Sequence, residues 1–177
     1  MSTASRKLIF SLFLLFVTSC APSDWSTFSP PSGGNFSVEL PGHPEEKVSS
    51  GSRENIHFTV HAYTLKPWFA VTKISYSIVT MDFQVPDSAT WNEEKALEGI
   101  KLSLMKQLGA NVTGEQPIEM AGRSGREILF SHKNGTLTAR ILPVGHRHYI
   151  LAMNHPEGKD FSADKSRFFN SFKFVQQ

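Results

Sequence analysis

The chain has 177 residues, a single cysteine and a formal net charge of +2. Its first twenty residues carry two basic side chains, Arg6 and Lys7, and no acidic one, so the remainder is balanced in charge. This balance excludes nucleic-acid binding through a basic surface, and the lone cysteine excludes an intramolecular disulfide. The length beyond residue 20 suits one domain with its own core.

The N-terminus has the order of a bacterial export signal. The apolar residues 8–17 follow the basic pair and end in Val-Thr-Ser-Cys at residues 17–20, which resembles a lipobox. We predict that residues 1–19 are a signal peptide and that Cys20 is acylated. The protein then lies in the cell envelope, lipid-anchored on the extracytoplasmic side.

Two alternatives to acylation remain open. Ordinary cleavage would leave Cys20 as a free thiol, and an uncleaved signal would act as a membrane anchor. The apolar run of residues 8–17 is about 15 Å long as a helix, whereas a bilayer core is roughly 30 Å thick. The length therefore favours cleavage over anchoring by the peptide itself.

Residues 20–35 are rich in Ser, Pro and Gly, which predicts a flexible tether after the lipidated cysteine. Trp25 and Phe28 interrupt this composition. They lie either at the lipid interface or, as we favour, docked onto the domain. We predict that residues 36–177 form a single α+β domain.

Alternating apolar and polar residues predict strands at residues 36–40 and 56–65, and β-branched residues predict a third strand at 71–79. The polar residues 45–54 are expected to form a loop.

Two helices are predicted. Residues 90–93 have the form of a capping box with Thr90 as the N-cap, and an apolar stripe then runs to a C-terminal cap at Gly109. Phenylalanines at residues 161, 168 and 172 predict a C-terminal helix that packs over the sheet.

Two tight turns predict a three-stranded meander. Asn134-Gly135 favours a type I′ hairpin turn, and a second turn is expected at Gly145-His146. The pairs expected across these hairpins are Phe130 with Ala139, Ile128 with Ile141, Leu142 with Tyr149, and Ile141 with Ile150.

Several stretches together resemble short bacterial envelope proteins with the PsbP-like fold. They comprise residues 36–44, the helix that ends at Gly109, and residues 125–127, 147–151 and 168–172. The resemblance implies an α/β/α sandwich, in which an antiparallel sheet is flanked by helices. It also implies a docking or assembly role, because members of the fold are regarded as such modules.

No motif predicts a catalytic residue, a metal site or a cofactor. His57 and His61 would share a strand face, yet a zinc site needs three or four converging ligands. Aromatic and basic residues at turns suggest an interaction surface at the sheet end that carries Trp68 and the turn around His146.

The sequence thus predicts a non-catalytic interaction or assembly module, attached to the membrane through Cys20 and bound to another envelope protein. Two alternatives stay open. One is a periplasmic enzyme or a metal-binding domain that uses His57 and His61, and the other is a carrier of a small apolar ligand held between sheet and C-terminal helix.

Overall fold

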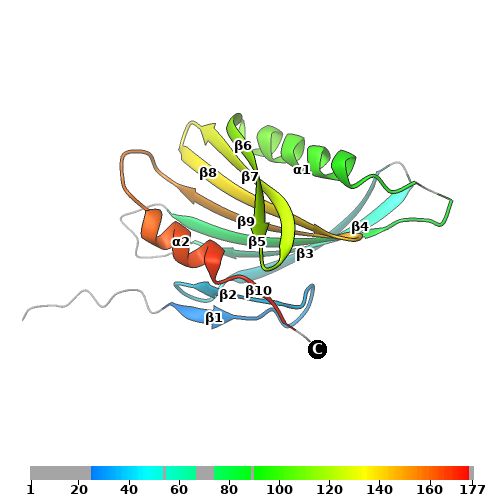
Figure 1. Cartoon of the computed structure of the whole chain (residues 1–177), viewed down its shortest axis with the longest axis horizontal. Coiled ribbons are helices and arrows are strands. Elements are labelled where there is room, and N and C mark those ends of the chain that lie inside the picture. The colour runs from blue at the N-terminus through cyan, green and yellow to red at the C-terminus, as the bar shows by residue number, and fades with distance from the viewer. Residues whose placement is uncertain (1–24, 54, 67–73, 89, 176–177) are drawn as a thin grey trace, which may run out of the picture.

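A seven-stranded antiparallel sheet dominates the computed structural model, which describes residues 25–53, 55–66, 74–88 and 90–175 (Figure 1). The strands, in their order across the sheet, are β3 (Glu45–Arg53), β4 (Ile56–Leu65), β5 (Ser75–Gln84), β9 (Arg147–His155), β8 (Gly135–Val144), β7 (Arg123–His132) and β6 (Asn111–Met120). The central strands β5, β9 and β8 are the most buried, which leaves β3 and β6 as the two edges.

One face of the sheet is covered by helix α1 (Glu93–Leu108). The helix begins where the Lys95 N–H donates to Asn92 Oδ1 at 2.8 Å, and it ends at Gly109 in the left-handed conformation with φ 58°. Its stripe of Leu97 and Ile100 is buried against the sheet, as predicted. Asn92 is therefore the N-cap, and the prediction of Thr90 is wrong by two residues.

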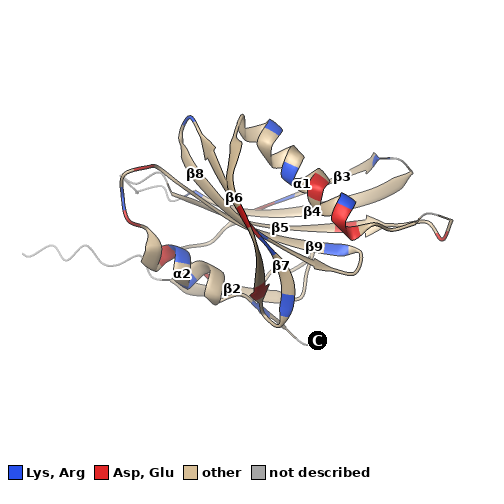
Figure 2. Cartoon of the chain, turned by 45° about the horizontal axis from the view of Figure 1, so that its top comes forward, with Lys and Arg blue, Asp and Glu red and all other residues tan. Residues whose placement is uncertain are grey.

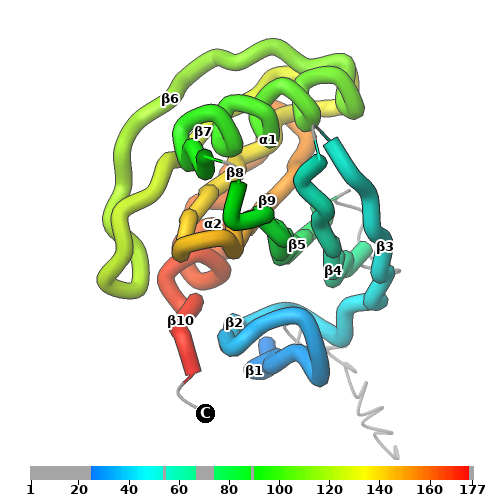
Figure 3. The backbone as a smooth tube through the Cα atoms, turned by 90° about the vertical axis from the view of Figure 1, so that its right-hand side faces the viewer, coloured from blue at the N-terminus to red at the C-terminus, as the bar shows by residue number. Residues whose placement is uncertain are grey.

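The opposite face is covered by helix α2 (Ser162–Asn170) together with a second, three-stranded sheet (Figure 3). Its strands are β1 (Ser26–Phe28), β2 (Phe36–Leu40) and β10 (Lys173–Phe174), with β2 in the middle. Phe36 stacks on Phe172 at 5.6 Å between ring centroids, and Phe168 meets Tyr76 at 5.2 Å. This aromatic layer forms the larger of two core clusters.

The expected α/β/α sandwich is wrong. The described part of the chain is β-rich, and the face opposite α1 is shared between one short helix and a small sheet. The reason lies in β2, whose alternating Phe36, Val38 and Leu40 are at most 1% exposed. A period of two directs all three side chains into the core, so a strand layer lies where a helical layer was expected.

The domain also begins earlier than residue 36. Ser26–Phe28 pair with β2 inside the predicted tether. Trp25 packs edge-on against Tyr76 at 5.6 Å, and Phe28 lies 5.3 Å from Tyr63. Docking of these two aromatic residues on the domain is thereby confirmed.

Residues 45–53 form a strand, so the predicted loop is wrong. β3 is an edge strand with both faces exposed, and it therefore lacks the apolar alternation on which strand prediction depends. The third predicted strand, residues 71–79, is found as β5 at Ser75–Gln84, and residues 71–73 lie outside the described residues.

The second hairpin has the predicted register, with Leu142 opposite Tyr149. The first is shifted by two residues, so that Phe130 faces Leu137 and not Ala139. Gly135 is the cause: it belongs to β8 with φ 137°, and a Cβ there would lie 2.1 Å from the carbonyl oxygen of His155. The glycine is thus needed for close approach to β9 rather than for a type I′ turn.

Candidate functional site

The β8–β9 turn lies at one end of the sheet and carries His146, one of the two residues predicted for an interaction surface. His146 is exposed, and its carbonyl oxygen accepts a hydrogen bond from Phe83 N–H at 2.8 Å. This bond joins the turn to the end of β5. The turn is therefore held in place by a neighbouring strand.

Trp68, the other predicted residue, lies outside the described residues. The strand residues nearest its segment are Leu65, opposite Tyr76, and Ser75, opposite Asn154. Arg147, at the β8–β9 turn, pairs with the far end of β5. The register thus places the ends of β4 and β5 that flank this segment at the other end of the sheet from His146.

Four rings cluster beside the turn on the α1 face. Trp91 lies 4.9 Å from Phe83, 5.2 Å from His146 and 5.8 Å from His148, measured between ring centroids. Trp91 directly precedes the N-cap of α1, so the start of the helix fixes its position. The cluster joins the helix start to the turn.

His148 lies at the bottom of this cluster and is fully buried. Neither of its ring nitrogens, nor the indole nitrogen of Trp91, has a hydrogen-bond partner among the described residues. Burial lowers the pKa of His148 to about 4, because desolvation disfavours the charged imidazolium. At neutral pH the ring is therefore uncharged and acts as a packing group.

The other face at this end of the sheet is polar. Arg147 forms an ion pair with Asp82 of β5. Nearby, the Tyr63 hydroxyl donates to the Ser32 carbonyl, and burial raises the pKa of Tyr63 to about 12. The protonated phenol is a hydrogen-bond donor that helps hold the segment 30–35 across the sheet.

Glu46 of β3 completes this attachment. Its carboxylate accepts from Ser32 Oγ at 2.8 Å and lies 3.1 Å from both His61 Nδ1 and Tyr63 Oη. The hydrogen bonds from His61 and Ser32 hold the pKa of Glu46 below its usual value. The carboxylate stands between the serine and the histidine, whereas in a Ser-His-acid triad the histidine is central. This arrangement anchors the loop rather than activating Ser32.

A concavity of about 440 Å³ lies between this loop and the sheet. Its lining consists of residues 30–35 and Arg147. A lining of small and polar residues with the arginine of β9 suits the recognition of a polar group rather than an apolar one. We therefore take the concavity, with the neighbouring His146 turn, as the candidate binding site.

The histidines do not converge into a metal site. His57 and His61 lie four residues apart on β4, which separates their backbones by about 13 Å. Within the described ranges no three His, Cys, Asp or Glu side chains gather closely enough to hold a metal ion.

The phenylalanines that suggested an apolar carrier are part of the core. Phe168 and Phe169 are fully buried, and Phe172 is 2% exposed. They pack on one another and on aromatic residues of β2, β5 and β9. Their side chains are thus occupied by core contacts.

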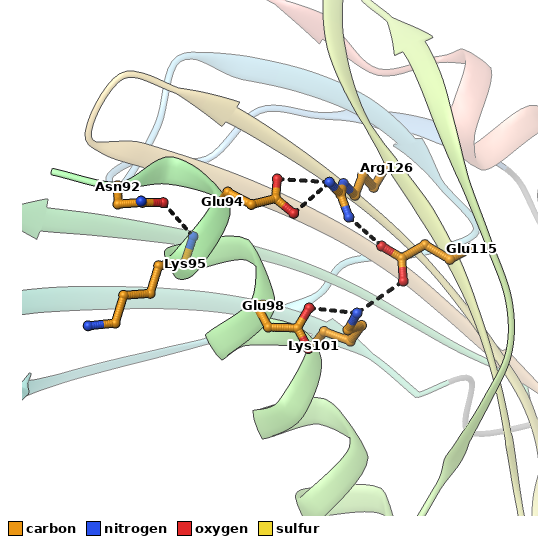
Figure 4. A network of polar contacts seen from close by, with 7 residues as sticks. All are labelled: Asn92, Glu94, Lys95, Glu98, Lys101, Glu115 and Arg126. Carbon is orange, nitrogen blue, oxygen red and sulfur yellow. Dashed lines mark hydrogen bonds and ion pairs between the residues drawn. The ribbon is translucent and has the colours of Figure 1, made fainter.

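Three arginines of the meander, Arg126, Arg140 and Arg147, pair with acids of the domain itself. Arg126 binds Glu94 of α1 and Glu115 of β6, both at 2.6 Å, and Lys101 bridges Glu98 and Glu115 (Figure 4). A separate ion pair joins Arg140 of β8 to Glu127 of β7 at 2.8 Å. The pairs of Arg126 and Lys101 fasten α1 to the β6 side of the sheet, whereas the pair of Arg140 lies within the sheet. Figure 2 shows the acidic and basic residues on the ribbon.

Sequence reasoning missed Trp91 and the Arg147–Asp82 pair. Arg147 and Asp82 are 65 residues apart in the chain, and only the pairing of β5 with β9 brings them together. The signal for Trp91 was its place just before a helix, where an aromatic residue often packs back on the core.

Comparison with known proteins agrees with a PsbP-like fold. The solution structure of cyanobacterial PsbP (CyanoP) from Synechocystis sp. PCC 6803 superposes with a TM-score of 0.54 and 8% sequence identity. The match covers 89% of this chain and 96% of that one. No family model matches the sequence, and no curated protein is detectably similar to it. At this identity the likeness shows the fold alone.

Proposed function

We propose that the chain is an exported lipoprotein, acylated at Cys20, whose domain is a non-catalytic binding module held against a bacterial envelope membrane. The lipobox-like residues 17–20 support the acylation. No helix in the described part of the chain combines the length and apolarity needed to cross a bilayer.

The polar concavity beside Arg147 is the observation that carries the binding role. It is lined by residues 30–35 and Arg147, a set suited to binding a polar segment of a partner protein without reacting with it.

The position of Trp25 adds a geometric consequence. Its ring packs on Tyr76 and lies under the guanidinium of Arg167 at 5.0 Å, which fixes Trp25 on the domain only five residues after Cys20. Five residues span at most about 18 Å. An acyl anchor at Cys20 therefore holds the domain close to the bilayer, on the side of α2 and the small sheet.

Two experiments test the two parts of the proposal. Metabolic labelling with an alkyne fatty acid should label the wild type and Ser19→Ala, which keeps a small residue before the cysteine, but not Cys20→Ser. Labelling of Cys20→Ser, or none of the wild type, would refute acylation.

Crosslinking in intact cells followed by capture tests binding. We expect one dominant partner with the wild type, a loss of at least tenfold with Arg147→Ala, and no change with the control Arg123→Ala at the exposed first residue of β7. Equal recovery with both variants would place the interface elsewhere.

A further inference from the structure

We infer that β3 is the surface through which two copies of this chain join their seven-stranded sheets into one continuous sheet. β3 is the edge of the sheet, and no strand pairs with its outer side within the part of the chain that the structure describes (Figure 3). All its residues are exposed except the half-buried Gly51. An edge of this kind presents a row of unpaired backbone donors and acceptors.

The edge is regular and already in the conformation that a partner strand requires. Nine consecutive residues pair with β4 from Glu45–Thr64 to Arg53–Ile56 without a bulge. The hydrogen bonds of Glu46 to Ser32 and Tyr63 fix one end of the strand. Little conformational entropy is therefore lost when a strand is added.

The sequence of β3 is complementary to itself. When β3 pairs antiparallel with its own copy over all nine residues, the pairing is centred on Ser49, and Glu45 lies opposite Arg53 of the second copy. This places two opposite-charge pairs symmetrically at the ends. Arg53 also reaches towards Gly99 of α1 in its own chain, and the five donors of a guanidinium can serve both contacts.

The centre of this pairing carries no charge. Residues 48–50, which pair with one another across the axis, are Val, Ser and Ser, Val48 is 54% exposed, and Lys47 at the next position lies opposite Gly51. In the centred register Val48 faces Ser50 of the second copy, so small and apolar side chains meet without repulsion. About eight to ten new backbone hydrogen bonds would form, two for every hydrogen-bonded pair.

The symmetry also suits a membrane-held protein. Antiparallel pairing of a strand with its copy has a two-fold axis perpendicular to the sheet, so both α2 faces lie on the same side. If Cys20 is acylated, as proposed above, both anchors then enter one bilayer. The interface itself does not depend on acylation, and its test does not involve Cys20.

Cysteine crosslinking of the full chain, purified in mild detergent and treated with a gentle oxidant, tests the register. In the centred pairing the two Ser49 Cα atoms are about 5 Å apart, within reach of a disulfide, whereas those of Ser52 are about 20 Å apart. We expect Ser49→Cys to give at least tenfold more disulfide-linked dimer than Ser52→Cys. Peptide mapping distinguishes these bonds from any that involve Cys20.

A second pair of variants tests the association without a crosslink. Ser49→Lys places two lysines opposite each other on the axis, whereas Ser52→Lys faces Glu46 of the second copy. We expect sedimentation of the full chain in detergent to show that Ser49→Lys raises the dissociation constant of the dimer at least tenfold. Ser52→Lys should raise it less than threefold. Equal yields of the two cysteine dimers, absence of both, or equal effects of the two lysines overturns the inference.

Discussion

The two edge strands of the seven-stranded sheet, β3 and β6, are of similar length. They differ in whether their sequence and regularity allow a further strand to pair with the outer edge. β6 contains Pro117, and its pairing with β7 shifts register between Val112 and Gly114. β3 has neither a proline nor a bulge over its nine residues. A proline and a bulge both discourage a further strand from pairing. The β6 edge is therefore poorly suited to pairing with a further strand, whereas the β3 edge can accept one.

The same asymmetry appears in how each edge is attached. β6 is fastened to α1 through Glu115, which accepts from Lys101 and Arg126. The side-chain contacts of β3 lie near its ends: Glu46 meets Tyr63 and His61 of β4, and Arg53 lies near Gly99 of α1. One edge is thus tied to the helix layer above it, and the middle of the other stands clear.

Two alanine substitutions of glycine provide the strongest test of this asymmetry. A Cβ at Gly125, next to the β6 edge, would lie 2.4 Å from the Ile141 carbonyl oxygen, whereas at Gly51 of β3 it would meet only the Phe58 ring, at 2.7 Å. A ring can turn away, but a strand backbone cannot. We expect Gly125→Ala to lower the free energy of unfolding by at least about 3 kcal/mol and Gly51→Ala by about 1 kcal/mol.

Denaturant unfolding of both variants measures these costs. Similar losses for the two would show that the β3 side is as tightly packed as the β6 side and would contradict the comparison.

Lowering the pH tests the middle strand of the sheet, β9, which lies between the two edges. His148 of β9 has a pKa of about 4 when folded against 6.5 in the unfolded chain, so the unfolded state binds more protons between these values. This contribution is fully present above pH 6.5 and is lost as the pH falls towards 4. The loss amounts to at most about 3 kcal/mol.

His148→Phe removes the titrating group while keeping a ring among Phe83 and Trp91. The free energy of unfolding measured from pH 7.5 to pH 4 should fall less steeply in this variant than in the wild type. Identical slopes would show that another group is responsible.

The structure and the sequence analysis give different N-caps for α1, Asn92 and Thr90 respectively. Asn92→Ala should destabilise the domain by about 1 kcal/mol, because the Lys95 N–H loses its acceptor, whereas Thr90→Ala should change stability by less than about 0.5 kcal/mol. Thermal or denaturant unfolding of the two variants decides between them. The larger loss in Thr90→Ala would restore the predicted capping box.

The strands that could be predicted from the sequence are those with a buried face. β2 and β4 alternate or are rich in apolar residues because one face is buried, and both were predicted with correct bounds. β3 was missed because an edge strand with two exposed faces has no such pattern. The same cause that hid β3 from prediction makes it available to a partner.

Of the residues at the candidate site, the sequence analysis named His146, and its role in binding stays a prediction. Trp91 and Arg147 take their places through long-range pairing, Arg147 with an acid 65 residues away. The shift of the first hairpin likewise depends on a contact between Gly135 and His155 of a third strand. A local turn signal contains no information on such contacts.

The smallest expected effect concerns the ion network that ties α1 to the β6 edge. Its charges are partly exposed, and the hydrogen bonds of Arg126 and Lys101 hold the pKa of Glu115 below its usual value. Because solvent screens such pairs, Glu115→Gln should cost less than about 1 kcal/mol, and the cost should shrink at high salt. Its clearer consequence is local: hydrogen exchange of β6 amides should quicken in this variant while that of β3 stays unchanged. Equal acceleration at both edges would show that the network stabilises the whole sheet and not the β6 side alone.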